Sequence, residues 1–87
     1  MASYQVNWKR SAAKELQVLP KSIIERILKV VEQLSMNPFP IGVRKFVGSE
    51  HTYRIREGDY RVIYTITAST LVIEIIRVGH RKDVYDR

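Results

Sequence analysis

Cysteine is absent from the 87-residue chain, and several other features that would classify it are missing as well. Without cysteine there is no disulfide framework and no thiolate metal site, and two histidines alone make structural zinc unfavourable. No apolar run approaches the roughly 20 residues of a membrane span. The first ten residues alternate and lack the apolar core of a signal peptide. We therefore expect a single domain, residues 1–87, located in the cytoplasm, with no metal, no cofactor and no membrane partner.

Acidic residues are the minority, since nine Asp and Glu stand against fifteen Lys and Arg, for a net charge of +6. Residues 1–40 carry six basic and three acidic groups, and residues 41–87 carry nine and six, so each part is +3. The charge is therefore spread over the folded body and does not form a basic tail. A balance of this kind is compatible with a nucleic-acid partner.

The most ordered pattern in the chain is a hairpin-like stretch, residues 53–64, which begins with alternating apolar residues and arginines. A period of two is typical of a strand with one buried face. Gly58-Asp59 suits a two-residue turn, and a three-residue loop from Glu57 is compatible too. The two-residue turn predicts three cross-strand pairs: Glu57 with Tyr60, Arg56 with Arg61, and Arg54 with Ile63.

This register sorts the hairpin side chains onto two faces. One face carries Tyr53, Ile55, Val62 and Tyr64. The other carries Arg54, Arg56 and Arg61, and we call it the arginine face. Guanidinium groups held close together on a rigid sheet repel one another unless something anionic lies there. The arginine face is therefore the first candidate binding site.

The first half of the chain predicts one strand and two helices. Residues 3–8 alternate as a strand, with Trp8 as an apolar anchor. Residues 11–19 and 21–35 show apolar residues at helical spacing, and Pro20 separates the two helices. The second helix should bury the stripe formed by Ile23, Ile27, Leu28, Val31 and Leu34 against the apolar face of the hairpin.

The second half predicts further strands. Residues 45–48 resemble a short edge strand or turn, and residues 52–56, 60–67 and 71–78 form a meander. The register of the last strand stays open: a two-residue turn before it places Glu74 on the arginine face, and a three-residue turn places Arg77 there. We predict a small α+β domain with an N-terminal strand and an αα-hairpin packed on one face of a mainly antiparallel, twisted sheet.

The C-terminal segment follows the last strand directly, and Gly79 should let His80 and Arg81 project beside the arginine face. Three segments now resemble one family, the RelE/ParE superfamily of bacterial and archaeal toxins. They are Lys-Phe-x-Gly at 45–48, Tyr-Arg-x-Arg-x-Gly-Asp-Tyr-Arg-Val-Ile-Tyr at 53–64, and Val-Gly-His-Arg-x-x-x-Tyr at 78–85. The three segments agree with the family in order and spacing.

The resemblance implies a toxin of a type II toxin–antitoxin system, held inactive by an antitoxin that wraps it. A basic toxin favours an acidic antitoxin segment. In the RelE branch the toxin enters the ribosomal A site and cuts mRNA there without a metal. Carried over by motif, the site residues are Arg54, Arg56, Arg61, Arg81 and Tyr85. Further candidates for RNA binding are Lys45, Arg77 and Lys82.

The residue types suit RNA cleavage in which the 2′-hydroxyl attacks the adjacent phosphate. Arginine donates fixed, paired hydrogen bonds to phosphate oxygens and stays charged. Some relatives carry lysines where this chain has Arg54 and Arg56, and an arginine cannot give up its proton to act as a base. His80 is the candidate for proton transfer by intrinsic pKa; alternatively it binds RNA or caps the strand end.

Two other functions fit parts of the pattern. A ParE-like inhibitor of DNA gyrase would share the fold, the hairpin and the antitoxin but would have no nuclease chemistry. A simple nucleic-acid-binding module would explain the charge but not the clustered arginines. The combination of Arg81 and Tyr85 beside a basic face favours the nuclease.

Overall fold

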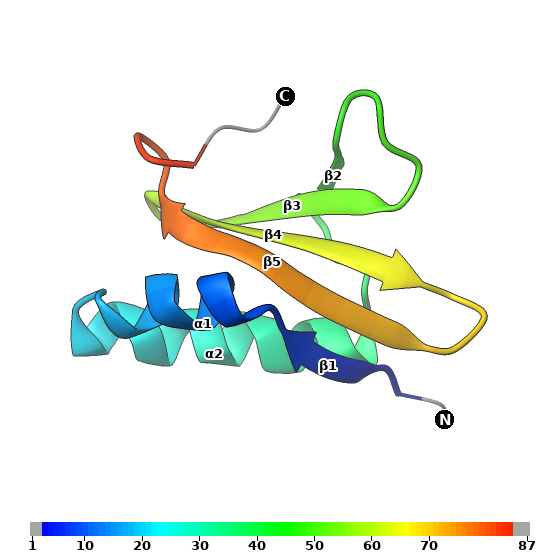
Figure 1. Ribbon diagram of the computed structural model, residues 1–87, viewed down its shortest axis with the longest axis horizontal. Helices are drawn as coiled ribbons and strands as arrows, with labels where there is room; N and C mark the ends of the chain where they lie inside the picture. The colour runs from blue at the N-terminus through cyan, green and yellow to red at the C-terminus, as the bar shows by residue number, and fades with distance from the viewer. Residues whose placement is uncertain (1–2, 85–87) are drawn as a thin grey trace.

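The computed structural model describes residues 3–84 and contains a five-stranded sheet with two helices against one of its faces (Figure 1). The chain runs through β1 (Gln5–Trp8), α1 (Arg10–Gln17), α2 (Lys21–Met36), β2 (Arg44–Lys45), β3 (Thr52–Glu57), β4 (Tyr60–Thr67) and β5 (Val72–His80). The strand order is β1-β5-β4-β3-β2, in which β1 pairs with β5 in parallel and every other pair is antiparallel. This architecture confirms the predicted α+β domain with an αα-hairpin on one sheet face.

The core lies between the helices and the apolar face of the hairpin. The residues that α2 and β4 bury in it are Ile27, Val31, Leu34, Val62, Tyr64 and Ile66. Our predicted helical stripe was wrong at Leu28, which is 46% exposed. Leu28 follows the fully buried Ile27, and one residue turns an α-helix by about 100°, which carries its side chain out of the core.

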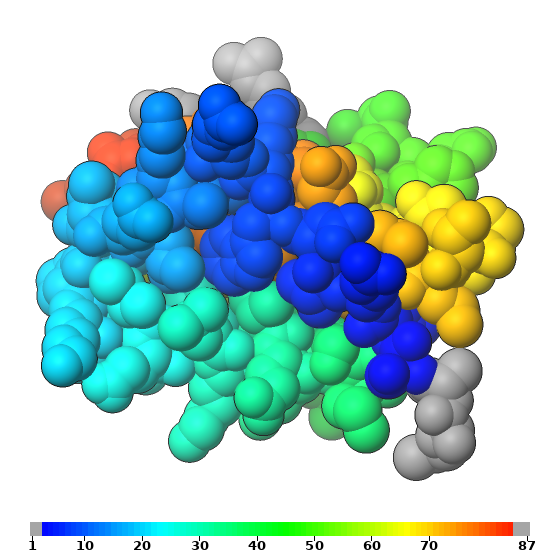
Figure 2. All heavy atoms as spheres, turned by 60° about the horizontal axis from the view of Figure 1, so that its bottom comes forward, coloured from blue at the N-terminus to red at the C-terminus, as the bar shows by residue number. Residues whose placement is uncertain are grey.

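The two helices meet at Pro20, as the sequence predicts. Leu19 N–H donates to the Leu16 carbonyl at 3.1 Å, and the chain then turns so that Pro20 precedes the first residue of α2. Figure 2 brings the lower side of Figure 1 forward and shows α1, α2 and β1 covering much of it. Over residues 3–84, no helix is both long enough and apolar enough to cross a membrane.

The β3–β4 hairpin has the register predicted for a two-residue turn. The pairs are Glu57 with Tyr60, Arg56 with Arg61, Ile55 with Val62, Arg54 with Ile63 and Tyr53 with Tyr64. Gly58 adopts a φ of +61°, a left-handed backbone conformation that would be strained in a residue with a side chain. Arg26 of α2 donates two hydrogen bonds to the Glu57 carboxylate beside this turn, at 2.9 and 3.1 Å. The end of the hairpin is thereby held against the helix layer.

The pairing of β4 with β5 contains a β-bulge, and this bulge determines the register of β5 that the sequence left open. Near the end of the hairpin Arg77 pairs with Ile63, whereas beyond the irregularity at Ile63/Tyr64 Glu74 pairs with Thr65. Directly paired residues share a sheet face, so both Glu74 and Arg77 lie on the arginine face. The sequence offered these as alternatives because a single uninterrupted register admits only one of them. The extra residue of a bulge resets the alternation, so both side chains reach the same face.

Candidate functional site

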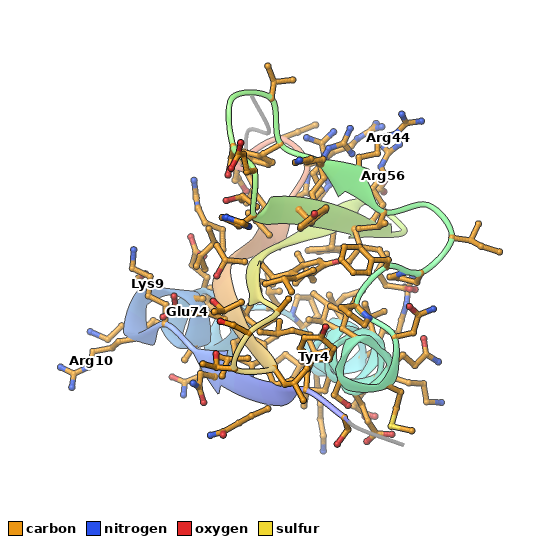
Figure 3. All side chains as sticks on the ribbon, turned by 90° about the vertical axis from the view of Figure 1, so that its right-hand side faces the viewer. Tyr4, Lys9, Arg10, Arg44, Arg56 and Glu74 are labelled. Carbon is orange, nitrogen blue, oxygen red and sulfur yellow. The ribbon has the colours of Figure 1, made fainter. Side chains whose placement is uncertain are left out.

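The arginine face is the side of the sheet opposite the helices, and its side chains form rows across the strands. The first row, which we call the 44–77 row, contains Arg44, Arg54, Ile63 and Arg77. The second, the 56–79 row, contains Arg56, Arg61 and Gly79. The rows are two residues apart along each strand, which corresponds to roughly 7 Å. In Figure 3 Arg44 and Arg56 project on the same side of the sheet, away from α2.

Arg44 is a member of this face that the sequence reasoning missed. It pairs with Arg54 through the short edge strand β2, and its side chain is exposed. The sequence contained a partial signal, because residues 44 and 45 are both basic in a predicted edge strand. Only the register against β3 decides which of the two lies on the arginine face.

Arg77 is held at the margin of the face by a carboxylate from α1. Strand β1 ends at Trp8, opposite Ile75, so within residues 3–84 no strand pairs with the outer edge of β5 beyond that point. Glu15 lies along this edge and accepts from Val78 N–H at 2.9 Å and from Arg77 Nη2 at 3.1 Å. The pair is partly exposed, with 44% of the Arg77 side chain accessible. One carboxylate therefore closes the strand edge and anchors Arg77.

The segment after β5 folds back over the 56–79 row. Gly79 pairs with Arg61, and a Cβ built on Gly79 would approach Val84 Cγ2 to 2.7 Å. Val84 is 1% exposed, and its carbonyl accepts from Arg61 Nη1 at 3.4 Å. Only glycine leaves room for this contact, so Gly79 lets the segment cover the sheet and hold the Arg61 guanidinium from one side.

Arg81 extends the arginine face beyond the hairpin turn. Its N–H donates to the Asp59 carbonyl at 2.8 Å, and its Nε lies 3.9 Å from Asp59 Oδ1. Half of the Arg81 side chain is exposed. Asp59 is therefore more than a turn residue, because it fixes the backbone at residue 81 and draws the guanidinium towards the end of the hairpin.

The opposite end of the sheet is chemically different. A hollow of about 460 Å³ is lined by Phe39, His51, Tyr53, Thr65, Ile66, Thr67, Ala68 and Ser69. Within the described part of the chain, none of these lining residues is an arginine or a lysine. This hollow therefore does not belong to the arginine face.

Tyr64 fastens the loop after α2 to the sheet near that hollow. Its hydroxyl donates to the Pro38 carbonyl at 2.8 Å, and its side chain is fully buried. Burial, and then the neighbouring Tyr53, raise the pKa of Tyr64 above its ordinary value. The phenol stays protonated and acts as a structural hydrogen-bond donor.

With this geometry in view, comparisons with known proteins identify the family. A family model described as the ParE toxin of the type II toxin–antitoxin system parDE matches residues 6–85. The chain belongs to the RelE/ParE toxin superfamily. Its relatives include toxin RelE3 of Methanocaldococcus jannaschii, which is 31% identical over 86 residues, with 94% of this chain and 96% of that protein covered. Toxin RelG of Mycobacterium tuberculosis is 32% identical, with 97% and 98% covered.

A solved structure supports the same RelE/ParE assignment. The archaeal RelE–RelB complex from Pyrococcus horikoshii contains a chain with a TM-score of 0.82 and 34% identity to this protein. The match covers 94% of this chain and 99% of that one. Both the named relatives and this structure place the protein with the RelE toxins of the superfamily.

The candidate for proton transfer, His80, does not lie on the arginine face. It pairs with Tyr60, and the two rings stack edge-on with centroids 5.4 Å apart, on the helix side of the sheet. Strand β5 continues through His80, so side-chain alternation places Gly79 on the arginine face and its neighbour on the other. His80 Nδ1 accepts from Lys82 N–H at 3.1 Å, the strand-end cap that was the alternative.

The remaining candidates are distributed as follows. Lys45 pairs with Tyr53, which puts it on the helix side of the sheet, whereas its neighbour Arg44 lies on the arginine face. Lys82 is exposed in the turn after β5, next to Arg81. Tyr85 lies outside the described residues. The structure thus brings together Arg54, Arg56, Arg61, Arg77 and Arg81, adds Arg44, and separates His80 and Lys45 from them.

Proposed function

We propose that this RelE/ParE toxin is an endoribonuclease that cuts mRNA in the ribosomal A site and thereby stops translation in the cytoplasm. The observation that supports this most is the arrangement of arginines from four strands and the β5 exit on one sheet face. The helix side of the sheet supplies the core, and the arginine face is the opposite side of the same sheet. The relatives that carry the name RelE point to the same branch of the superfamily.

The proposed reaction is attack by an RNA 2′-hydroxyl on the adjacent phosphorus. The 2′-oxygen forms a bond to phosphorus as the 5′-oxygen leaves, which yields a 2′,3′-cyclic phosphate and a 5′-hydroxyl end. The proton lost by the 2′-hydroxyl is balanced by one gained by the leaving oxygen. Because the nucleophile belongs to the RNA, the reaction needs no metal-bound hydroxide, and we propose a metal-independent enzyme.

Charge stabilisation is the main contribution that we assign to the protein. Negative charge builds up on the phosphorane oxygens, and preorganised donors aimed at such charge are each worth about 3–4 kcal/mol of barrier. We assign this role to Arg56, Arg61 and Arg81, and substrate binding to Arg54. Tyr85 remains the candidate for stacking on a base near the cut, as the family resemblance implies.

We propose a cognate antitoxin as the protein partner that binds the toxin when the toxin is not on the ribosome. The related chain from Pyrococcus horikoshii was solved as a RelE–RelB complex. This protein carries a net charge of +6, so an acidic segment is the complementary partner for its arginine face. We propose that a cognate antitoxin binds the toxin through such a segment and prevents access to the ribosome.

The decisive experiment is primer extension on mRNA in a reconstituted translation system, with Arg81→Ala beside the parent toxin. We expect cuts within codons on translating ribosomes, and a loss of about 100- to 1,000-fold in the variant. Arg10→Ala is the matched control, because it removes the same charge from the exposed start of α1. Addition of the cognate antitoxin should abolish the cuts made by the parent.

The ParE description of the matching family model supports one alternative, inhibition of DNA gyrase. Intact mRNA together with gyrase-linked DNA damage would establish that alternative and exclude the nuclease. RNA binding that Arg81→Ala weakens, with no cleavage by the parent toxin, would show a simple binding module instead.

A further inference from the structure

We infer that the bound RNA runs along the strands of the sheet, with two successive phosphates on the two arginine rows. This inference rests on the proposed function and adds to it a second phosphate subsite, the 44–77 row, beside the scissile phosphate at the 56–79 row. The relevant groups are Arg44 and Arg54, which pair directly across β2 and β3, in the first row and Arg56 and Arg61 in the second.

The first argument is the spacing of the rows. Equivalent side chains on one face of a strand recur every two residues, so the rows are roughly 7 Å apart. Successive phosphates of an extended single strand are separated by a comparable distance. Neighbouring strands are only about 4.8 Å apart. A backbone that crossed the strands would therefore meet side chains at too short an interval.

The second argument is what interrupts each row. In the 44–77 row, Ile63 stands between Arg54 and Arg77 and is 2% exposed, so the middle of that row offers no charge. In the 56–79 row, the β5 side ends at Gly79, which Val84 covers. A backbone that crossed the sheet along either row would meet an apolar position. A backbone that follows β3 meets Arg54 at one step and Arg56 at the next.

The third argument is continuity beyond the second row. Arg81 lies one further step in the same direction, at the end of the hairpin, fixed by Asp59. The positive groups thus follow one line from β2 towards the hairpin turn. In the opposite direction the arginine face no longer carries arginines on β4 and β5, because the next pair there is Thr65 with the acidic Glu74. The line of phosphates therefore stops after the 44–77 row in that direction.

The test is a thermodynamic cycle in which one arginine of the protein and the charge of one RNA phosphate are removed separately and together. Synthetic mRNAs carry one neutral methylphosphonate linkage, either immediately 5′ or immediately 3′ of the cut, and are placed on ribosomes. Cleavage is measured as kcat/KM for the parent toxin and for Arg44→Ala. On unmodified RNA we expect Arg44→Ala to reduce kcat/KM about tenfold or more, since it removes a charged hydrogen bond.

The expected result is that this loss shrinks to less than about twofold on RNA neutralised at one of the two flanking linkages. At the other linkage the loss should remain complete. Arg54→Ala should couple to the same linkage as Arg44→Ala, because the two arginines are directly paired in the 44–77 row. Lys45→Ala removes a charge one residue away on the helix side of the sheet, so its coupling to either linkage should be nil.

Three outcomes would overturn the inference. The losses could be independent of both neutral linkages, or Arg44 and Arg54 could couple to different linkages, as in an RNA that crosses the strands. Coupling of Lys45 equal to that of Arg44 would show a diffuse field in place of a subsite. In each case cleavage by the parent toxin would still stand. Absence of cleavage on unmodified RNA would instead contradict the proposed function itself.

Discussion

At the scale of single residues, the chemistry of the site follows from the choice of arginine. A guanidinium is charged at every relevant pH and presents a rigid set of donors, so it suits stabilisation of a phosphorane and cannot serve as a base. His80 was the residue best suited to proton transfer, but it lies on the helix side of the sheet and caps the end of β5. We therefore expect charge and geometry to dominate catalysis.

His80→Asn tests this directly. Asparagine places an acceptor where imidazole Nδ1 accepts from Lys82 N–H, so the cap is kept and the titratable group is removed. We expect cleavage in the primer-extension assay close to that of the parent, with the same rate profile from pH 5 to 8. A proton-transfer role would instead show a loss of about 100-fold or more and an altered pH profile.

Tyr64 determines how stability depends on alkaline pH. Burial raises its pKa in the folded state above the ordinary value of 10.0, whereas the unfolded chain ionises near that value. The stability that Tyr64 contributes through this pKa difference is therefore complete below about pH 10 and is lost as the pH rises above it. The free energy of unfolding should fall there by about 1.4 kcal/mol per pH unit.

The Tyr64→Phe variant should lose that alkaline slope. It should also be less stable at neutral pH by about 1–3 kcal/mol, because the buried Pro38 carbonyl loses its donor. The measurement is urea unfolding from pH 7 to 11, with Tyr4→Phe as the control. Equal slopes in the parent and in Tyr64→Phe would contradict this account.

At the scale of elements, the helix pair supports the arginine face from beneath and contacts the sheet at Glu57 of β3 and at Val78 of β5. Helix α2 buries one stripe against the hairpin and binds Glu57 beside its turn. Helix α1 contributes Glu15, which replaces the missing strand neighbour of β5 at Val78. Each helix therefore both covers the core and fixes a margin of the sheet where arginines project.

Two adjacent residues of α2 provide a matched test of the packing. Ile27 is fully buried and Leu28 is 46% exposed. Ile27→Ala should destabilise the protein by about 2–5 kcal/mol. Leu28→Ala should cost less than about 0.5 kcal/mol. Chemical denaturation of the two variants measures both, and similar losses would show that α2 faces the sheet differently.

Glu15 tests how the edge of β5 is closed. Glu15→Ala leaves the Val78 N–H without its acceptor and should cost about 1–3 kcal/mol in the free energy of unfolding. Glu15→Gln keeps an oxygen at that position and should cost distinctly less. Urea titration of both variants compares them, and equal losses would indicate that the ion pair with Arg77 matters more than the edge hydrogen bond.

At the scale of the whole molecule, the two sides of the sheet have separate tasks. The helix side provides the hydrophobic core. The arginine face collects charge from segments that are far apart in the sequence, from Arg44 to Arg81. Concentrating cations on one surface gives the toxin a directed positive potential, and we propose that this potential steers it towards RNA or towards an acidic antitoxin segment.

The salt dependence of RNA binding should report this arrangement. For single strands the slope of log K against log salt is about −0.7 per phosphate neutralised. The double variant Arg44→Ala/Arg54→Ala should lower its magnitude by about 0.7, since it removes one phosphate contact. Fluorescence anisotropy with a 2′-O-methyl RNA, which cannot be cut, measures the slope. Arg10→Ala should leave it unchanged, and an equal reduction there would contradict a localised site.

The sequence by itself determined the parts of this protein that depend on near neighbours. Alternation and the Gly58-Asp59 turn predicted the hairpin register, and helical spacing with Pro20 predicted the helix pair. These features could be read because strand alternation, helical periodicity and turn chemistry act over a few residues.

Only the tertiary structure decided how segments far apart align. The register between β2 and β3 places Arg44, and not Lys45, on the arginine face. The bulge in β5 places both Glu74 and Arg77 on that face. Continuation of β5 through residue 80 turned His80 towards Tyr60. A shift of one residue between strands exchanges the two faces, so these assignments depend on long-range register, which no local pattern in the chain encodes.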